Sequence, residues 1–142
     1  MRSRLVRVWQ RKGLLTQATL LLSVLRLSLA WLPYLKVRQW VVETSQPKGR
    51  EINNPEAYQA RLVWAIQLAG RFLLGDKPCL PQALAMQWFL RRVGIQTSLN
   101  IGVRKDELRG ISAHAWVEKE GEIIIGGTMS PQQFKRLRLV KS

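Results

Sequence analysis

Two side chains in this sequence are suited to nucleophilic catalysis, and each residue type occurs only once. The single cysteine is Cys79 and the single histidine is His114. A cysteine attacks a carbonyl carbon as the thiolate, and a neighbouring histidine can accept the thiol proton and later donate a proton to a leaving amine. The chain therefore offers one cysteine–histidine pair, whose partners lie far apart in the sequence.

The residues around Cys79 predict that it lies at the N-terminus of a helix, just outside its first turn. Pro78 and Pro81 flank it, and proline is tolerated in a first helical turn because the N–H that it lacks would have no partner there. From Leu80 to Val93 apolar residues recur at helical spacing, and Gly94 fits a left-handed C-terminal cap. The unpaired N–H groups and the positive dipole end of a helix N-terminus favour the thiolate over the thiol.

His114 is predicted to lie at the start of a short strand, 113–119, which follows a polar loop over 104–112. Trp116 is two residues further on and therefore on the same face of the strand, where it packs beside the histidine. The alternative for both residues is purely structural. A lone cysteine is most often a small buried hydrophobe, and spacing along the sequence does not establish contact between distant residues.

The elements that must position the pair are helices first and then an antiparallel sheet. Helices are expected over 14–32, 34–42 and 55–74, with Gly13 as a break before the first and Asn54 as the N-cap of the third. Strands are expected over 95–103, 113–119 and 122–125, with a tight turn at Glu120-Gly121 and a short basic helix or tail after Ser130-Pro131. The predicted fold class is α+β, with the cysteine at a helix N-terminus packed on a small antiparallel sheet.

The polar stretch 43–54 is the best internal boundary in the chain. We therefore expect a basic N-terminal helical region over 1–50 and a cysteine-containing domain over 51–142. One cysteine rules out an internal disulfide framework and fits a cytoplasmic protein, and one Cys with one His is too few for a structural zinc site.

The net charge of +14 is placed mainly at the two ends of the chain. Ten basic residues precede position 51, against the single acid Glu43, and four more lie in the last eight residues: Arg2, Arg4, Arg7, Arg11, Lys12, Arg26, Lys36, Arg38, Lys48 and Arg50, then Lys135, Arg136, Arg138 and Lys141. Such an excess indicates docking to nucleic acid, an anionic membrane or an acidic protein or peptide. No nucleic-acid-binding motif accompanies it, so we expect no nucleic acid partner.

The apolar segment 14–32 has a basic flank, which is typical of a signal peptide or a membrane span. Arg26 lies in its middle, where a charge is costly in lipid; no small-residue cleavage site is evident; and Pro33 follows at once. We expect an amphipathic helix instead, packed on the domain, on a partner or, as a peripheral contact through residues 14–32, on a membrane surface.

The order of the cysteine helix and the histidine strand resembles the transglutaminase-like branch of papain-type cysteine enzymes. Four segments are similar, more narrowly, to the lasso-peptide biosynthesis B proteins: Cys79-Leu80-(x)-Gln82-Ala83-Leu84-Ala85, Trp88-(x)-Leu90-Arg91-Arg92-(x)-Gly94-Ile95, Ile101-Gly102-Val103-Arg104-Lys105-Asp106 and Ala113-His114-Ala115-Trp116-Val117-Glu118. The resemblance covers about residues 55–127, and its motifs are specific in combination. It implies a leader peptidase that cuts a ribosomally made precursor peptide before a separate enzyme closes the ring.

The resemblance also implies a Cys79–His114–Asp106 triad that works through a thioester, without metal or cofactor. Asp106 matches the family's acid upstream of the histidine, and an antiparallel hairpin is expected to bring it close to His114. The alternative for Asp106 is an exposed loop acid. The wider superfamily pattern often takes its acid from the strand after the histidine, where this chain has only Glu118, Glu120 and Glu122, and Glu118 is too far along the strand to orient the ring.

The partners implied by the resemblance are the precursor peptide, a separate small leader-recognition protein and the macrocycle-forming cyclase. Two other functions stay open at the level of sequence. One is a catalytically idle transglutaminase-like module that binds the precursor, and the other is a small basic nucleic-acid-binding protein.

Overall fold

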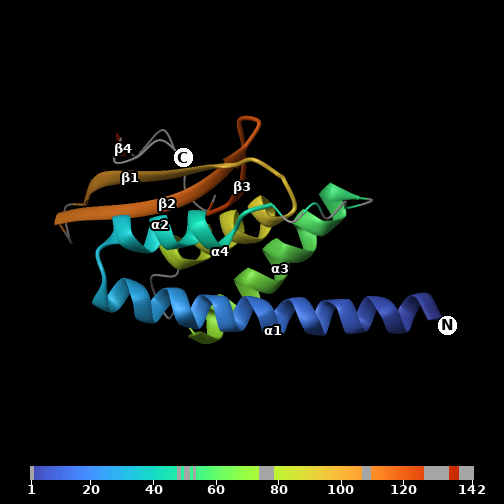
Figure 1. The fold of residues 1–142 in the computed structure, drawn as a ribbon. Coiled ribbons are helices and arrows are strands. Elements are labelled where there is room, and N and C mark those ends of the chain that lie inside the picture. Colours follow the sequence, from blue (N-terminus) through green and yellow to red (C-terminus); the bar gives the residue numbers. More distant parts are fainter. Residues whose placement is uncertain are drawn as a thin grey trace.

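The computed structural model describes the backbone of residues 2–47, 49, 52, 54–73, 79–106, 110–126 and 135–137, and the side chains of the same ranges except 1–11, 79, 104–106, 111–113 and 135–137 (Figure 1). The elements in chain order are α1 Arg2–Trp31, α2 Tyr34–Thr44, α3 Pro55–Leu73, α4 Cys79–Arg92, β1 Ser98–Asp106, β2 Gly110–Lys119, β3 Glu122–Ile125 and β4 Lys135–Leu137. The fold is α+β, as the sequence predicts.

Helix α4 lies at the centre of the molecule. It packs against β1, β2 and β3 on one side and against α1, α2 and α3 elsewhere, so that the sheet and α1 lie on opposite sides of it (Figure 1). Side chains on several sides of α4 are therefore buried: Ala83, Leu84, Ala85, Met86, Phe89 and Leu90. The element that begins with the candidate nucleophile is therefore a rigid core helix.

Two helix ends, the start of α3 and the end of α4, are fixed by local hydrogen bonds that the sequence predicts. Asn54 caps α3, since its Oδ1 accepts from the N–H of Ala57 at 3.1 Å. Gly94, at φ +81°, ends α4: its N–H donates to the Arg91 carbonyl and that of Ile95 to the Leu90 carbonyl. These two bonds form a Schellman motif, which requires the left-handed residue that glycine supplies most easily.

Helix α1 is longer than expected, because it runs through Gly13 without a break. The prediction of a break was wrong. A glycine costs a helix only about 1 kcal/mol, and the residues on both sides of it are good helix formers. Packing then fixes the helix, since Ala18, Leu21, Leu22 and Leu25 are buried against the rest of the molecule.

The sheet has the order β3-β2-β1-β4 and is antiparallel throughout. Glu120 and Gly121 both have positive φ, as a two-residue type I′ turn between β2 and β3 requires. Strand β4 corrects the expectation of a basic helix or tail: Lys135–Leu137 pairs with β1, opposite Ile101–Val103. A polar, basic segment has no periodicity that identifies a strand, so only the exposed edge of β1 could select this pairing.

The helices before residue 50 share one apolar core with the later elements, from Ala18 on α1 to Ile125 on β3. A domain boundary near residue 50 remains a prediction. Within the described part of the chain, Lys12–Trp31 in α1 is long and apolar enough to cross a membrane by length and composition.

Candidate active site

Cys79 is the first residue of α4, at the helix N-terminus that the sequence predicts. Its backbone is therefore in the first turn, where N–H groups have no intrahelical carbonyl partner. The helix that it begins packs against β2, which carries His114. The side chain of Cys79 lies outside the described residues, so contact between its thiol and His114 stays a prediction.

The imidazole of His114 is held by a backbone carbonyl. Its Nε2 is within hydrogen-bonding distance of the carbonyl oxygen of Gly126, which follows β3. A carbonyl oxygen only accepts, so the ring must carry its proton on Nε2 in this arrangement, and the lone pair of the neutral ring is then on Nδ1. Nδ1 is therefore the nitrogen that can act as a base.

Trp116 and Glu118 form a second support for the histidine ring. The rings of His114 and Trp116 are stacked, with centroids 6.2 Å apart and an interplanar angle of 21°. The buried Trp116 in turn donates from Nε1 to Glu118 Oε1 at 2.9 Å. Sequence reasoning correctly placed Trp116 beside the histidine but gave Glu118 no part. His114, Trp116 and Glu118 follow one another at intervals of two residues along one strand, and this spacing is the sequence signal that links them.

The alternation along β2 places these three residues on the face opposite Ala115 and Val117, although Trp116 is itself buried. Ala115 and Val117 belong to the apolar core, whereas His114, Trp116 and Glu118 share the opposite face of the strand. His114 is half-buried, and it is therefore neither a core residue nor a fully solvated one. Such an environment suits a residue that must both exchange protons and keep one orientation.

Gly126 can approach the histidine because it has no side chain. Its φ is +86°, and a Cβ at this position would lie 2.6 Å from the carbonyl oxygen of Ala115 and 2.9 Å from the Cα of Trp116. No other residue type fits there without movement of the backbone. The sequence showed only a Gly-Gly pair ending a strand, which is also what an ordinary strand end looks like, and so this partner of His114 was missed.

The register of the hairpin corrects the reason for placing Asp106 beside His114. His114 pairs with Gly102, whereas Asp106 pairs with Gly110. Four strand residues separate Gly102 from Asp106, which amounts to roughly 13 Å. The hairpin therefore does not bring Asp106 next to the histidine, and its membership of a triad stays a prediction that rests on resemblance alone.

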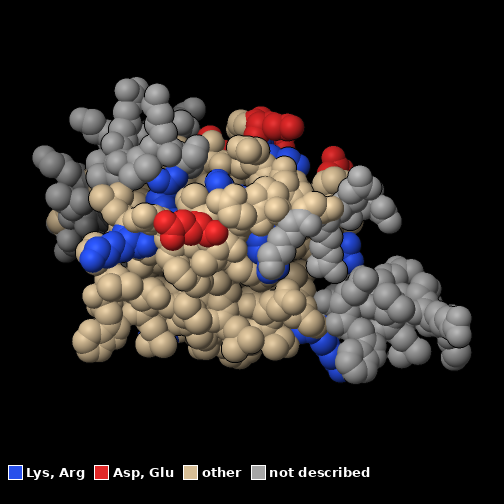
Figure 2. All heavy atoms as spheres, in the orientation of Figure 1, with Lys and Arg blue, Asp and Glu red and all other residues tan. Residues whose placement is uncertain are grey.

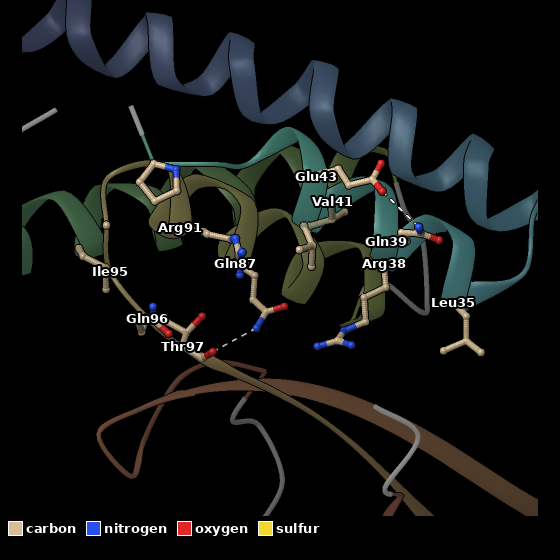
Figure 3. Close-up of a pocket in the computed structure, with 13 residues that line it drawn as sticks. Leu35, Arg38, Gln39, Val41, Glu43, Gln87, Arg91, Ile95, Gln96 and Thr97 are labelled. Carbon is tan, nitrogen blue, oxygen red and sulfur yellow. Dashed lines mark hydrogen bonds between the residues drawn. The ribbon is translucent and has the colours of Figure 1, made fainter. Parts of the chain in front are cut away.

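A cavity lined by described residues lies away from Cys79. It has a volume of about 590 Å³ and is formed by α2, the C-terminal half of α4 and the segment that leads to β1 (Figure 3). Among the described residues no group of three His, Cys, Asp or Glu side chains could hold a metal ion.

A helix that begins at a cysteine, packed on an antiparallel sheet that carries a supported histidine, is the arrangement of a transglutaminase-like or papain-like core. The chain matches the family model described as the transglutaminase-like superfamily over residues 19–139. The match spans all of α2 to β4 and the C-terminal part of α1, and the chain therefore belongs to the transglutaminase-like superfamily, which includes cysteine peptidases. No curated protein and no solved structure matches the chain significantly.

Proposed function

We propose that this protein is a cysteine peptidase that removes the leader from a ribosomally made lasso-peptide precursor. The observation that carries the proposal is the position of the only cysteine as the first residue of α4. Strand β2 holds His114 in one orientation, on the face opposite Ala115 and Val117. The family shows the fold, and it includes cysteine peptidases. The four segments that resemble lasso-peptide B proteins supply the substrate class.

The proposed reaction begins with attack of the Cys79 thiolate on the carbonyl carbon at the junction of leader and core. The developing oxyanion accepts hydrogen bonds from N–H groups of the first turn of α4, including that of Cys79 itself. His114 donates a proton to the leaving amine, which breaks the C–N bond and leaves a thioester on Cys79. Water, deprotonated by the same imidazole, then hydrolyses the thioester and regenerates the thiol.

The expected partners are the precursor peptide, a separate small leader-recognition protein and the enzyme that closes the ring. Asp106 remains a candidate for the acid of the triad. Since the hairpin register keeps it away from the histidine, we assign the task of orienting the ring to the Gly126 carbonyl and the Trp116–Glu118 pair.

Alkylation of Cys79 by iodoacetamide tests whether the site is active or an idle binding module. Because the chain has no other cysteine, the reaction rate reports this thiol alone. An activated thiolate should give a rate that rises with a midpoint near neutral pH, well below about 8.5 for an ordinary thiol. The rate is measured as a function of pH by mass spectrometry.

His114→Ala is the control for this experiment. It should move the midpoint toward that of an ordinary thiol while circular dichroism stays unchanged. A wild-type midpoint near that of an ordinary thiol, unaffected by the substitution, would mean that Cys79 and His114 do not interact and that the protein is a binding module.

A further inference from the structure

The cavity beside α2 has apolar walls and two cationic side chains, a composition that suits a negatively charged group carried on a short aliphatic chain. Four lining residues, Leu35, Val41, Val42 and Ile95, give it apolar walls. Two guanidinium groups line it as well, Arg38 on α2 and Arg91 on α4, and they come from different elements (Figure 3). Small-molecule and side-chain sites are typically of this kind, mostly apolar with a few fixed polar groups.

Among the described residues, neither arginine of the cavity has the carboxylate partner that a buried cation normally has. Arg38 is only 7% exposed, and the Nε of Arg91 is buried without a hydrogen-bond partner. Neither side chain pairs with a carboxylate in the described part of the chain. Glu43, the acid in the lining, is exposed and instead accepts from Gln39 Nε2 at 3.1 Å. Burying a cation without a counter-charge is unfavourable, and the described residues do not balance the positive charge of this site.

Tyr34, which interacts electrostatically with Arg38, does not supply the missing charge. Burial raises the pKa of the Tyr34 phenol, although Arg38 acts in the opposite direction. The phenol is therefore neutral at pH 7, and the positive charge of Arg38 is not balanced by it.

We propose that this cavity binds a glutamate or aspartate side chain of a peptide, with Arg38 and Arg91 as the groups that pair with its carboxylate. Guanidinium groups form strong, directional hydrogen bonds to carboxylates, and the apolar walls match the methylene stem of such a side chain. The existence of the anion site stands on the cavity itself. Only the identification of that peptide with the precursor rests on the proposed function.

The position of the cavity sets a distance from the reaction centre. Cys79 and Arg91 lie near opposite ends of α4, and twelve helical steps correspond to roughly 18 Å along its axis. An extended peptide covers that distance in about five or six residues. A peptide with an acidic residue about five or six positions from the cleaved bond could therefore place that side chain in the cavity while the bond lies at Cys79.

Binding of a fluorescent peptide of alternating leucine and glutamate to the full chain, followed by polarisation, tests the site without any cleavage step. Arg38→Gln and Arg91→Gln should each weaken binding by about 10- to 100-fold, because each removes charge-assisted hydrogen bonds. Arg91→Gln breaks no hydrogen bond inside the described protein, so it keeps the test valid if Arg38→Gln does not fold.

The matched control is Arg92→Gln, which removes the same charge from the adjacent residue, whose guanidinium lies 4.6 Å from the centre of the Trp88 ring. It should change the affinity by less than about twofold, as expected of a partly exposed charge outside the cavity.

Equal losses in all three variants, or equal binding of a peptide with glutamine in place of glutamate, would overturn the site. If inorganic phosphate binds more tightly than the peptide and the same two arginine variants weaken its binding, the carboxylate assignment is refuted and the cavity is a phosphate site. An inactive enzyme that still binds the peptide would refute the proposed function and leave this site intact.

A separate observation concerns the outer face of α1. Leu20, Val24, Leu27 and Trp31 follow helical steps of four, three and four, and they are 63%, 44%, 63% and 85% exposed. Figure 2 shows a broad surface without charged side chains along the lower edge, where α1 lies in Figure 1. Contiguous exposed apolar surface of this kind is typical of an interaction site.

The charge of the chain indicates what covers this stripe. Residues 1–42 contain eight lysines and arginines and no acid, and five of the eight lie in the first twelve residues of the same helical segment. An apolar stripe on a basic helix that ends in an exposed tryptophan matches the surface of an anionic membrane. We infer that α1 lies in the plane of such a surface.

Crossing the membrane would conflict with the packing of α1. Its opposite face buries Ala18, Leu22 and Leu25, and Arg26 donates to the carbonyl of Leu73 on α3. Insertion would expose the core of the molecule and leave a charge in lipid. The in-plane arrangement keeps both sets of contacts.

Cosedimentation of the full chain with phosphatidylcholine vesicles, with and without phosphatidylglycerol, tests this inference. Binding should require the anionic lipid, and a Leu20→Gln, Leu27→Gln, Trp31→Gln triple variant should lower the partition coefficient at least about tenfold, because three apolar contacts are lost. Trp40→Gln on α2 is the control and should bind as the wild type does. Three outcomes would each overturn this inference. They are no binding of the wild type, equal binding to neutral vesicles, or a wild-type dimer that the triple variant abolishes and Trp40→Gln does not.

Discussion

The Cys79→Ala variant is expected to fold normally and to leave the precursor peptide uncut. Only a sulfur atom is removed, but without it neither the attack on the carbonyl nor the thioester can form. Loss of the nucleophile from a catalytic unit typically costs several orders of magnitude, so cleavage should fall at least about 1,000-fold. The measurement is the mass of the products after incubation with a candidate precursor and leader-binding partner.

Two further variants make this result specific. Cys79→Ser keeps the size of the side chain but has a weak nucleophile, so it should be nearly as inactive as Cys79→Ala. Arg92→Gln lies at the other end of α4 and should keep wild-type activity. Unchanged circular dichroism shows that the fold is intact. Cleavage by the Cys79→Ala variant within tenfold of the wild-type rate would refute the proposed function.

The second large effect is expected from Gly126→Ala. The added methyl group would meet the Ala115 carbonyl oxygen at 2.6 Å, so the Gly126 segment must move and its own carbonyl must leave the Nε2 of His114. Misplacement of a catalytic group by about 1 Å costs on the order of 100-fold in rate. The loss should appear in kcat with little change in KM, because the substrate is not contacted, and the alkylation midpoint of Cys79 should shift.

Gly121→Ala is a matched control for this variant. Gly121 has almost the same backbone conformation, with φ +82°, but a Cβ there would meet no atom within 4 Å. Both variants carry the strain of a left-handed alanine, on the order of 1 kcal/mol, and only Gly126→Ala also disturbs the histidine. If both variants cleave equally well, His114 is not positioned by the Gly126 carbonyl.

Local chemistry, which can be read in the sequence alone, determined several helix ends and the tight turn of this protein. Pro55 after Asn54, the start of a helix at Cys79, the cap at Gly94 and the turn at Glu120-Gly121 are all present. Each depends on the conformational preference of one or two residues and on hydrogen bonds to near neighbours in the chain. That only one cysteine–histidine pair is possible was likewise evident from composition alone.

Contacts between distant segments decided the rest. The register of β1 on β2 places Gly102, not Asp106, opposite His114, and β4 forms only because β1 offers it an edge. Sequence patterns fix which residues share a face of a strand, but not how far two strands slide past each other or which segment completes a sheet. The support of the histidine by a backbone carbonyl is equally invisible in sequence, because every residue has a carbonyl and only the tertiary fold brings that of Gly126 to the imidazole.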